Sequence, residues 1–65
     1  MRKTGTVIDC LPDANFKIDF GDGSKILRTY ISGKMRKYKI AVLLNDRVEV
    51  EVPDIGEIGR IVKRL

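Results

Sequence analysis

The sequence predicts an all-β protein in which five short strands close into a small barrel. The chain has 65 residues, which leaves room for one small core and one domain, residues 1–65. Several segments alternate between apolar and polar residues with the period of two that is typical of strands. Residues that favour turns separate these segments at short intervals, and the chain contains no repeat or linker.

Three of the strands are expected before residue 32. Thr6–Leu11 is apolar and β-branched, and the turn-forming segment Leu11–Asn15 follows it. Phe16–Phe20 alternates with period two and predicts a half-buried strand. Asp-Gly at positions 22 and 23 predicts a hairpin with a type I′ turn, in which both central residues have positive φ. The return strand is expected at Lys25–Ile31.

The predicted hairpin fixes which residues face each other. It pairs Ile18 with Leu27 and Phe16 with Thr29 on the inner face, and Lys17 with Arg28 on the outer face. Phe20 is expected to join Phe16 in the core. Like charges directly opposite each other are destabilising. One explanation is that Asp19, diagonal to Arg28, relieves the repulsion. The other is an anion-binding strip that consists of Lys17, Arg28 and Tyr30.

The second half of the chain predicts one helical turn and two more strands. Ser32 is expected to cap a short helix, and Ile40–Leu44 is expected to return to the core. Residues 47–52 alternate between charged residues and valines, which predicts the fourth strand, and Arg60–Leu65 is expected to form the fifth. A helical turn between strands three and four is typical of the OB-fold Greek-key barrel, with an SH3-like barrel as the main alternative.

Charge is unevenly distributed along the sequence. The chain has 13 Lys and Arg against 9 Asp and Glu, a net charge of +4 at pH 7, which is compatible with nucleic-acid binding. The cations gather in three clusters: Arg2 and Lys3; Lys34, Arg36, Lys37 and Lys39; and Arg60, Lys63 and Arg64. Residues 46–57 hold five carboxylates and one arginine, so we expect one acidic side and one basic side.

The sequence predicts no catalytic site, no cofactor and no metal site. It has no histidine, no nucleophile elbow and no phosphate-binding loop of P-loop spacing. Cys10 is the only cysteine, and we expect it to be a buried or half-buried space filler. No apolar segment approaches the roughly 20 residues of a membrane span, and the first ten residues lack the apolar region of a signal peptide. A cytoplasmic protein is therefore expected.

The segment SGKMRKYK, residues 32–39, carries four cations within six residues. On a short helix or loop they would point in several directions, an arrangement that suits phosphate groups and binding by counterion release. Tyr38 and Met35 could contact unstacked bases beside them. The alternative is a charged loop that only water contacts.

Four segments, GTVIDCLPDANFKIDF, YISGKMRKYKI, NDRVEVEV and GRIVKR, closely resemble bacterial-type translation initiation factor 1 in their order and spacing. The resemblance runs from Gly5 to Arg64, and ISGKMRK is its most specific part. It implies an OB-fold protein, monomeric when free, that binds the small ribosomal subunit at the aminoacyl-tRNA site. There it would help initiation factors 2 and 3 select the initiator tRNA and the start codon, with KMRKYK reaching into ribosomal RNA. Position 30 is Tyr where many relatives carry His.

Together, the charge clusters, the outer strip and the resemblance define the expected RNA-binding residues. They are Lys17, Arg28, Tyr30, Lys34, Met35, Arg36, Lys37, Tyr38, Lys39, Arg60, Lys63 and Arg64. Two alternatives are a general single-stranded RNA binder of the cold-shock kind, and a protein-protein module whose acidic side docks a basic partner. The first would need outward aromatic residues on neighbouring strands, and only Tyr30 and Tyr38 qualify.

Overall fold

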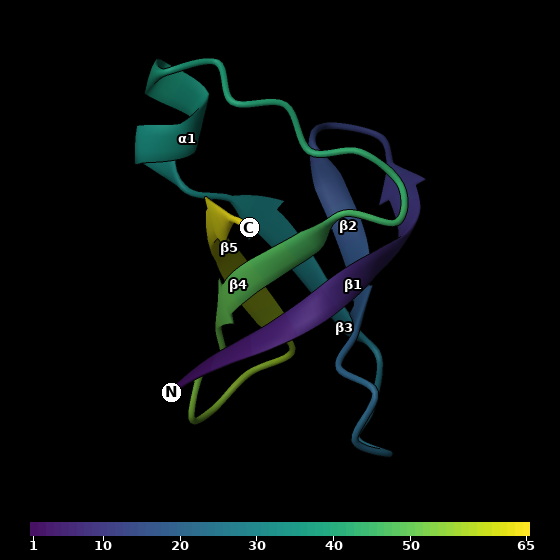
Figure 1. Ribbon diagram of the computed structural model, residues 1–65. Helices are drawn as coiled ribbons and strands as arrows, with labels where there is room; N and C mark the ends of the chain where they lie inside the picture. The colour runs from purple at the N-terminus through teal and green to yellow at the C-terminus, as the bar shows by residue number, and fades with distance from the viewer.

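A computed structural model describes residues 1–65 as a closed barrel of five strands with one short helix (Figure 1). The elements are β1 (Arg2–Leu11), β2 (Asn15–Asp19), β3 (Leu27–Ile31), α1 (Gly33–Lys37), β4 (Arg47–Glu51) and β5 (Ile58–Arg64). Around the barrel the order is β1-β2-β3-β5-β4, and only β3 and β5 are parallel. The closed barrel and the helix between β3 and β4 confirm the predicted fold class. The structure has no helix with the length and apolar character of a membrane span.

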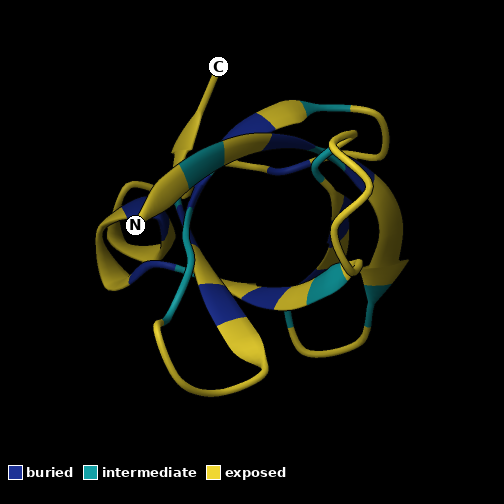
Figure 2. Ribbon diagram, turned by 90° about the horizontal axis from the view of Figure 1, so that it is seen from below, coloured by how far each residue is buried: buried dark blue, intermediate teal, exposed yellow.

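The core lies inside the barrel, where the apolar residues of the alternating strands converge. It consists of Val7, Phe16, Ile18, Met35, Val42, Val48, Val50 and Ile61. Viewed along the barrel, buried segments recur around the ring (Figure 2). Thr29 is buried among them, and its hydroxyl donates a hydrogen bond to the carbonyl of Phe16 at 3.2 Å. Phe20, which was expected in the core, is half-buried and packs against it.

The hairpin of β2 and β3 has the predicted register, but not the predicted turn. Its pairs are Phe16 with Thr29, Lys17 with Arg28, and Ile18 with Leu27. The connection comprises residues 20–26, and Gly23 has a φ of 82° whereas Asp22 has no positive φ. The type I′ turn is therefore wrong. Carboxylates shape the loop instead, because Asp19 accepts a hydrogen bond from the Gly21 amide and Asp22 accepts one from the Ser24 amide, each at 2.9 Å.

Cys10 is exposed, so its expected burial is wrong. β1 pairs with β4 only from Arg2 to Thr6, and its register with β2 shifts between Val7 and Asp9. Beyond that point β2 is the only strand that pairs with β1, so Cys10 lies at the rim of the barrel.

The segment Ile40–Leu44 contributes less to the core than expected. Only Val42 is buried, while Ile40, Leu43 and Leu44 are exposed. The segment is a loop and not a strand, so no alternation directs its other apolar side chains inward. The first and last strands of the sequence also begin earlier than predicted, at Arg2 for β1 and at Ile58 for β5.

Candidate nucleic-acid interface

The helix α1 is fixed at its start by Ser32. The Ser32 hydroxyl accepts a hydrogen bond from the Met35 amide at 3.3 Å, which confirms the predicted N-cap. The Ser32 amide donates to the carbonyl of Ile61 on β5 at 3.0 Å. The first turn of α1 is therefore attached to the barrel wall.

The end of α1 is a tight turn centred on Lys39. The Ile40 amide donates to the Met35 carbonyl at 3.0 Å, and the Lys39 amide donates to the Arg36 carbonyl at 3.2 Å. Lys39 has a φ of 55°, the left-handed conformation that closes a Schellman motif. This ending satisfies two carbonyls of a five-residue helix, and it fixes where the cations of the last turn lie.

The side chains of α1 separate into one buried residue and an exposed charged surface. Lys34, Arg36, Lys37 and Lys39 are all exposed, and none of them forms an ion pair. The exposed ring of Tyr38 lies 5.7 Å from the Lys37 Nζ, a cation–π distance. Met35 is only 2% exposed. The expectation that Met35 is available to a base is therefore wrong, because its side chain fills the core beneath the helix.

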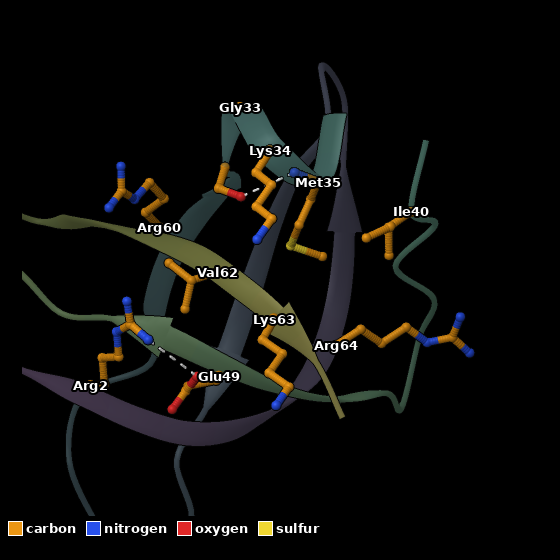
Figure 3. A pocket seen from close by; sticks show the side chains of 11 residues that line it. Arg2, Gly33, Lys34, Met35, Ile40, Glu49, Arg60, Val62, Lys63 and Arg64 are labelled. Carbon is orange, nitrogen blue, oxygen red and sulfur yellow. Dashed lines mark hydrogen bonds and ion pairs between the residues drawn. The ribbon is translucent and has the colours of Figure 1, made fainter. Parts of the chain in front are cut away.

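A cleft of about 950 Å³ lies between α1, β4 and β5 (Figure 3). Lys34 extends from α1 on one side, and Met35, Ile40 and Val62 supply apolar surface. The cations that line it come from several elements: Arg2, Lys34, Arg60, Lys63 and Arg64. Glu49 is the one carboxylate in the lining. The cleft is thus strongly cationic, which suits an anionic ligand.

The carboxylates of β4 and the residue before it do not form a separate acidic side. Three ion pairs join them to β1 and β5: Arg60 Nη2 to Glu51 Oε2 at 2.6 Å, Arg64 Nε to Asp46 Oδ2 at 3.2 Å, and Arg2 Nη1 to Glu49 Oε2 at 3.7 Å. The hydrogen bond from Arg60 lowers the pKa of Glu51 below its usual value. The predicted acidic side is therefore wrong at β4, because Asp46, Glu49 and Glu51 are partnered by cations that are distant in sequence. Asp54 and Glu57, the other two carboxylates of the predicted side, are exposed and form no ion pair.

The outer strip on the β2–β3 hairpin lies where the register predicted. Lys17, Arg28 and Tyr30 are exposed, and Lys17 is directly opposite Arg28. Asp19 forms no ion pair with Arg28, since its carboxylate accepts the Gly21 amide instead. The repulsion between the two cations is thus unrelieved by an ion pair, which favours the interpretation of this strip as an anion-binding surface.

Arg60 connects the outer strip to the cleft. It is the β5 partner of Tyr30 in the parallel pair of β3 and β5, and it also lines the cleft. From the predicted set, the residues that line the cleft are Lys34, Met35, Arg60, Lys63 and Arg64, of which Met35 is almost fully buried. The remaining residues of this segment project from α1 and its C-terminal turn and do not line the cleft: Arg36, Lys37, Tyr38 and Lys39.

Arg2 and Glu49 belong to this surface, although neither is among the predicted site residues. Arg2 lies on β1 because that strand begins at residue 2 and not at Thr6 as predicted, and β1 pairs with β4 in the closed barrel. The sequence carries no pattern that predicts this earlier start. Gly5 and Val7 are buried at alternate positions in the structure, but the residues Arg2–Thr6 do not alternate between apolar and polar types.

The barrel, the helix and the two cationic surfaces define this molecule as an OB-fold protein with the features of a nucleic-acid binder. No protein-family model matches the sequence. Among solved structures, translation initiation factor 1 from the Wolbachia endosymbiont strain TRS of Brugia malayi is similar to this chain. The two are 34% identical with a TM-score of 0.82, and the match covers 100% of this chain and 77% of that one. The chain belongs to the translation initiation factor 1 family.

A second solved structure has the same fold in a larger protein. YjeQ from Thermotoga maritima matches with a TM-score of 0.83 and 22% identity, over 100% of this chain and 23% of that one. At this identity the likeness shows the fold alone. The barrel therefore also occurs as one part of a longer chain.

Proposed function

We propose that this chain is a noncatalytic initiation factor that binds the small ribosomal subunit at the aminoacyl-tRNA site through ribosomal RNA. There it assists initiation factors 2 and 3 in selecting the initiator tRNA and the start codon. The observation that carries the proposal is the match to translation initiation factor 1 over the full length of this chain, in a structure where ISGKMRK forms a cation-bearing helix. In this proposal the protein is cytoplasmic and monomeric when free.

The ion pairs determine which cations are free to meet phosphate. Four of the 13 cations are held by carboxylates, and nine are not. The nine are Lys17, Lys25, Arg28, Lys34, Arg36, Lys37, Lys39, Arg47 and Lys63. Four of these lie on α1 and its C-terminal turn, the densest group in the molecule, so α1 is the proposed electrostatic anchor.

The other two functions have less support. A cold-shock-like binder needs neighbouring exposed aromatics, but Tyr30 and Tyr38 lie on different elements and Phe16 is buried. A protein-protein module that uses an acidic side would need free carboxylates on β4, where Glu49 and Glu51 are both paired.

The test is salt-dependent binding to purified small subunits, with and without a competing aminoacyl-site ligand. The double variant Lys34→Gln with Lys37→Gln removes two charges from α1. We expect its affinity to fall at every salt concentration and its salt slope to drop by about 1.5 to 2, because each phosphate contact contributes about 0.7 on a single strand and about 0.9 on a duplex. The matched control, Lys25→Gln with Arg47→Gln, removes two unpaired cations outside α1 and should leave the slope near wild type.

Three outcomes would contradict the proposal. If the two double variants lost the same affinity, α1 would not be the anchor. If the aminoacyl-site ligand did not compete, the binding site would lie elsewhere on the subunit. If the wild type bound arbitrary single-stranded RNA as tightly as it bound small subunits, the cold-shock-like function would replace the proposed one.

A further inference from the structure

Two carboxylates of β4 lie between the cations of the neighbouring strands. Glu49 and Glu51 alternate with the buried Val48 and Val50, so both point out of the barrel. In the ladders, Glu51 pairs with Arg2 on β1 and with Arg60 on β5, while Glu49 pairs with Lys63 on β5. Their side chains close ion pairs to Arg60 at 2.6 Å and to Arg2 at 3.7 Å.

We propose that Glu49 and Glu51 are specificity-determining residues that occupy the cationic groups of the cleft and so limit its binding of RNA of arbitrary shape. This inference rests on the proposed function, since it concerns the same RNA-binding surface. The carboxylates take the place that phosphate oxygens would otherwise take on Arg60 and Arg2. A phosphate that approaches these cations must displace a carboxylate and remain close to its charge.

The ion pairs of Glu49 and Glu51 affect the binding of RNA more than they affect the stability of the fold. The side chains of Arg60 and Glu51 are both more than 40% exposed, and exposed ion pairs contribute little to stability. The cations of α1 have no such carboxylate partners. A flexible RNA can therefore neutralise α1 freely, but it gains little from the β5 side of the cleft.

A folded RNA that docks on α1 can gain more binding free energy from the β5 side of the cleft than a flexible RNA can. Once its backbone is fixed by several contacts, its phosphates are held beside Arg60 and Lys63, which both line the same cleft as Lys34. Exchange of a carboxylate for a phosphate is then an intramolecular step with a high effective concentration. The carboxylates thus weaken binding to flexible RNA more than binding to a rigid, complementary RNA.

The test compares two double variants of equal charge change. One combines Glu49→Gln and Glu51→Gln, and the control combines Asp9→Asn and Glu57→Gln. The control residues are exposed, form no ion pair and do not line the cleft. The probes are a uridine 20-mer and purified small subunits, each titrated over a range of salt concentrations. Thermal unfolding of each variant verifies that it is folded.

For the Glu49 and Glu51 double variant we expect about tenfold tighter binding of the uridine 20-mer at low salt, and a steeper salt slope by about 0.7 for each cation that gains a phosphate. Affinity for small subunits should rise by a smaller factor, so that the ratio of the two affinities falls. The control should change both affinities by the same small factor. Equal tightening of both ligands, weaker binding of the 20-mer, or no difference from the control would overturn the inference. If the wild type failed to bind small subunits, the proposed function would fail, whereas the 20-mer data would still report on the carboxylates.

Discussion

Within ISGKMRK, adjacent residues serve folding and binding separately. Ser32 and Met35 are buried, and they attach α1 to β5 and to the core. Lys34 and Arg36, their neighbours in sequence, are exposed and unpaired. The segment thus combines a helix cap, a core position and a charged surface within a few residues.

Tyr30 is the residue on the outer strip whose ring could stack on a base. It is 43% exposed and lies next to Arg60 across the β3–β5 ladder. If the ring stacks, Tyr30→Ala should weaken binding to small subunits by about 1–3 kcal/mol, and Tyr30→Phe should keep most of the affinity because it keeps the aromatic face. Equilibrium binding and thermal unfolding of both variants provide the measurement. A large loss of stability in Tyr30→Ala with unchanged affinity would mean that the ring serves the fold instead.

At the scale of the element, the C-terminal turn of α1 combines backbone strain with charge in one residue. Lys39 has positive φ, which a residue with a Cβ adopts at a cost, and it is also one of the unpaired cations. Lys39→Gly removes the charge and the strain, whereas Lys39→Ala removes only the charge.

We expect Lys39→Gly to stabilise the fold by about 1 kcal/mol relative to Lys39→Ala, because glycine readily adopts the left-handed conformation. Both variants should lose the same affinity for small subunits, since both lose the same charge. Chemical denaturation and salt-dependent binding of the two proteins measure these effects. Unequal affinities would show that the shape of the turn, and not the Lys39 charge, determines its part in binding.

The hairpin shows which features of an element the sequence can predict. Alternation at Phe16 and Ile18 fixed the register, because a slip by one residue would turn the apolar face outward. The turn was not predictable from Asp-Gly alone. Asp19 and Asp22 each accept a hydrogen bond from an amide two residues further on, and Lys3 on the adjacent strand β1 donates a hydrogen bond to Asp22. The antiparallel pair of β1 and β2, which matches Thr6 with Asp19, brings Lys3 opposite Asp22 when its register is continued, so this contact depends on strand pairing and not on the turn residues.

Across the whole molecule, composition predicted the cationic character but not its arrangement. The clusters near Arg2 and Arg60 meet at the cleft because β1 and β5 both pair with β4. The same pairing neutralises Asp46, Glu49 and Glu51, three of the five carboxylates in the acidic segment of residues 46–57. Long-range strand pairing therefore determined both what the site contains and which cations remain free.

Barrel closure itself depends on a close approach at Gly59 of β5. A Cβ at this buried position would lie 2.6 Å from Leu27 Cδ2 on β3, 3.0 Å from Val50 Cγ1 on β4 and 3.2 Å from the backbone oxygen of Glu51. Three neighbouring strands thus meet at a site with no room for a methyl group. At Gly33, by contrast, a Cβ would meet no atom within 4 Å.

We expect Gly59→Ala to destabilise the protein by about 1–3 kcal/mol, because overpacking a closed barrel forces its side chains and strands to shift. For a domain of this size, each kcal/mol lowers the unfolding temperature by about 4–8 °C. Gly33→Ala, at the first position of α1, makes the same chemical change where there is space, and it should leave the unfolding temperature unchanged or slightly higher. Thermal unfolding followed by circular dichroism compares the two. If both substitutions shifted the midpoint equally, the effect would come from the loss of glycine flexibility, and the contact of β3, β4 and β5 at Gly59 would not limit the closure of the barrel.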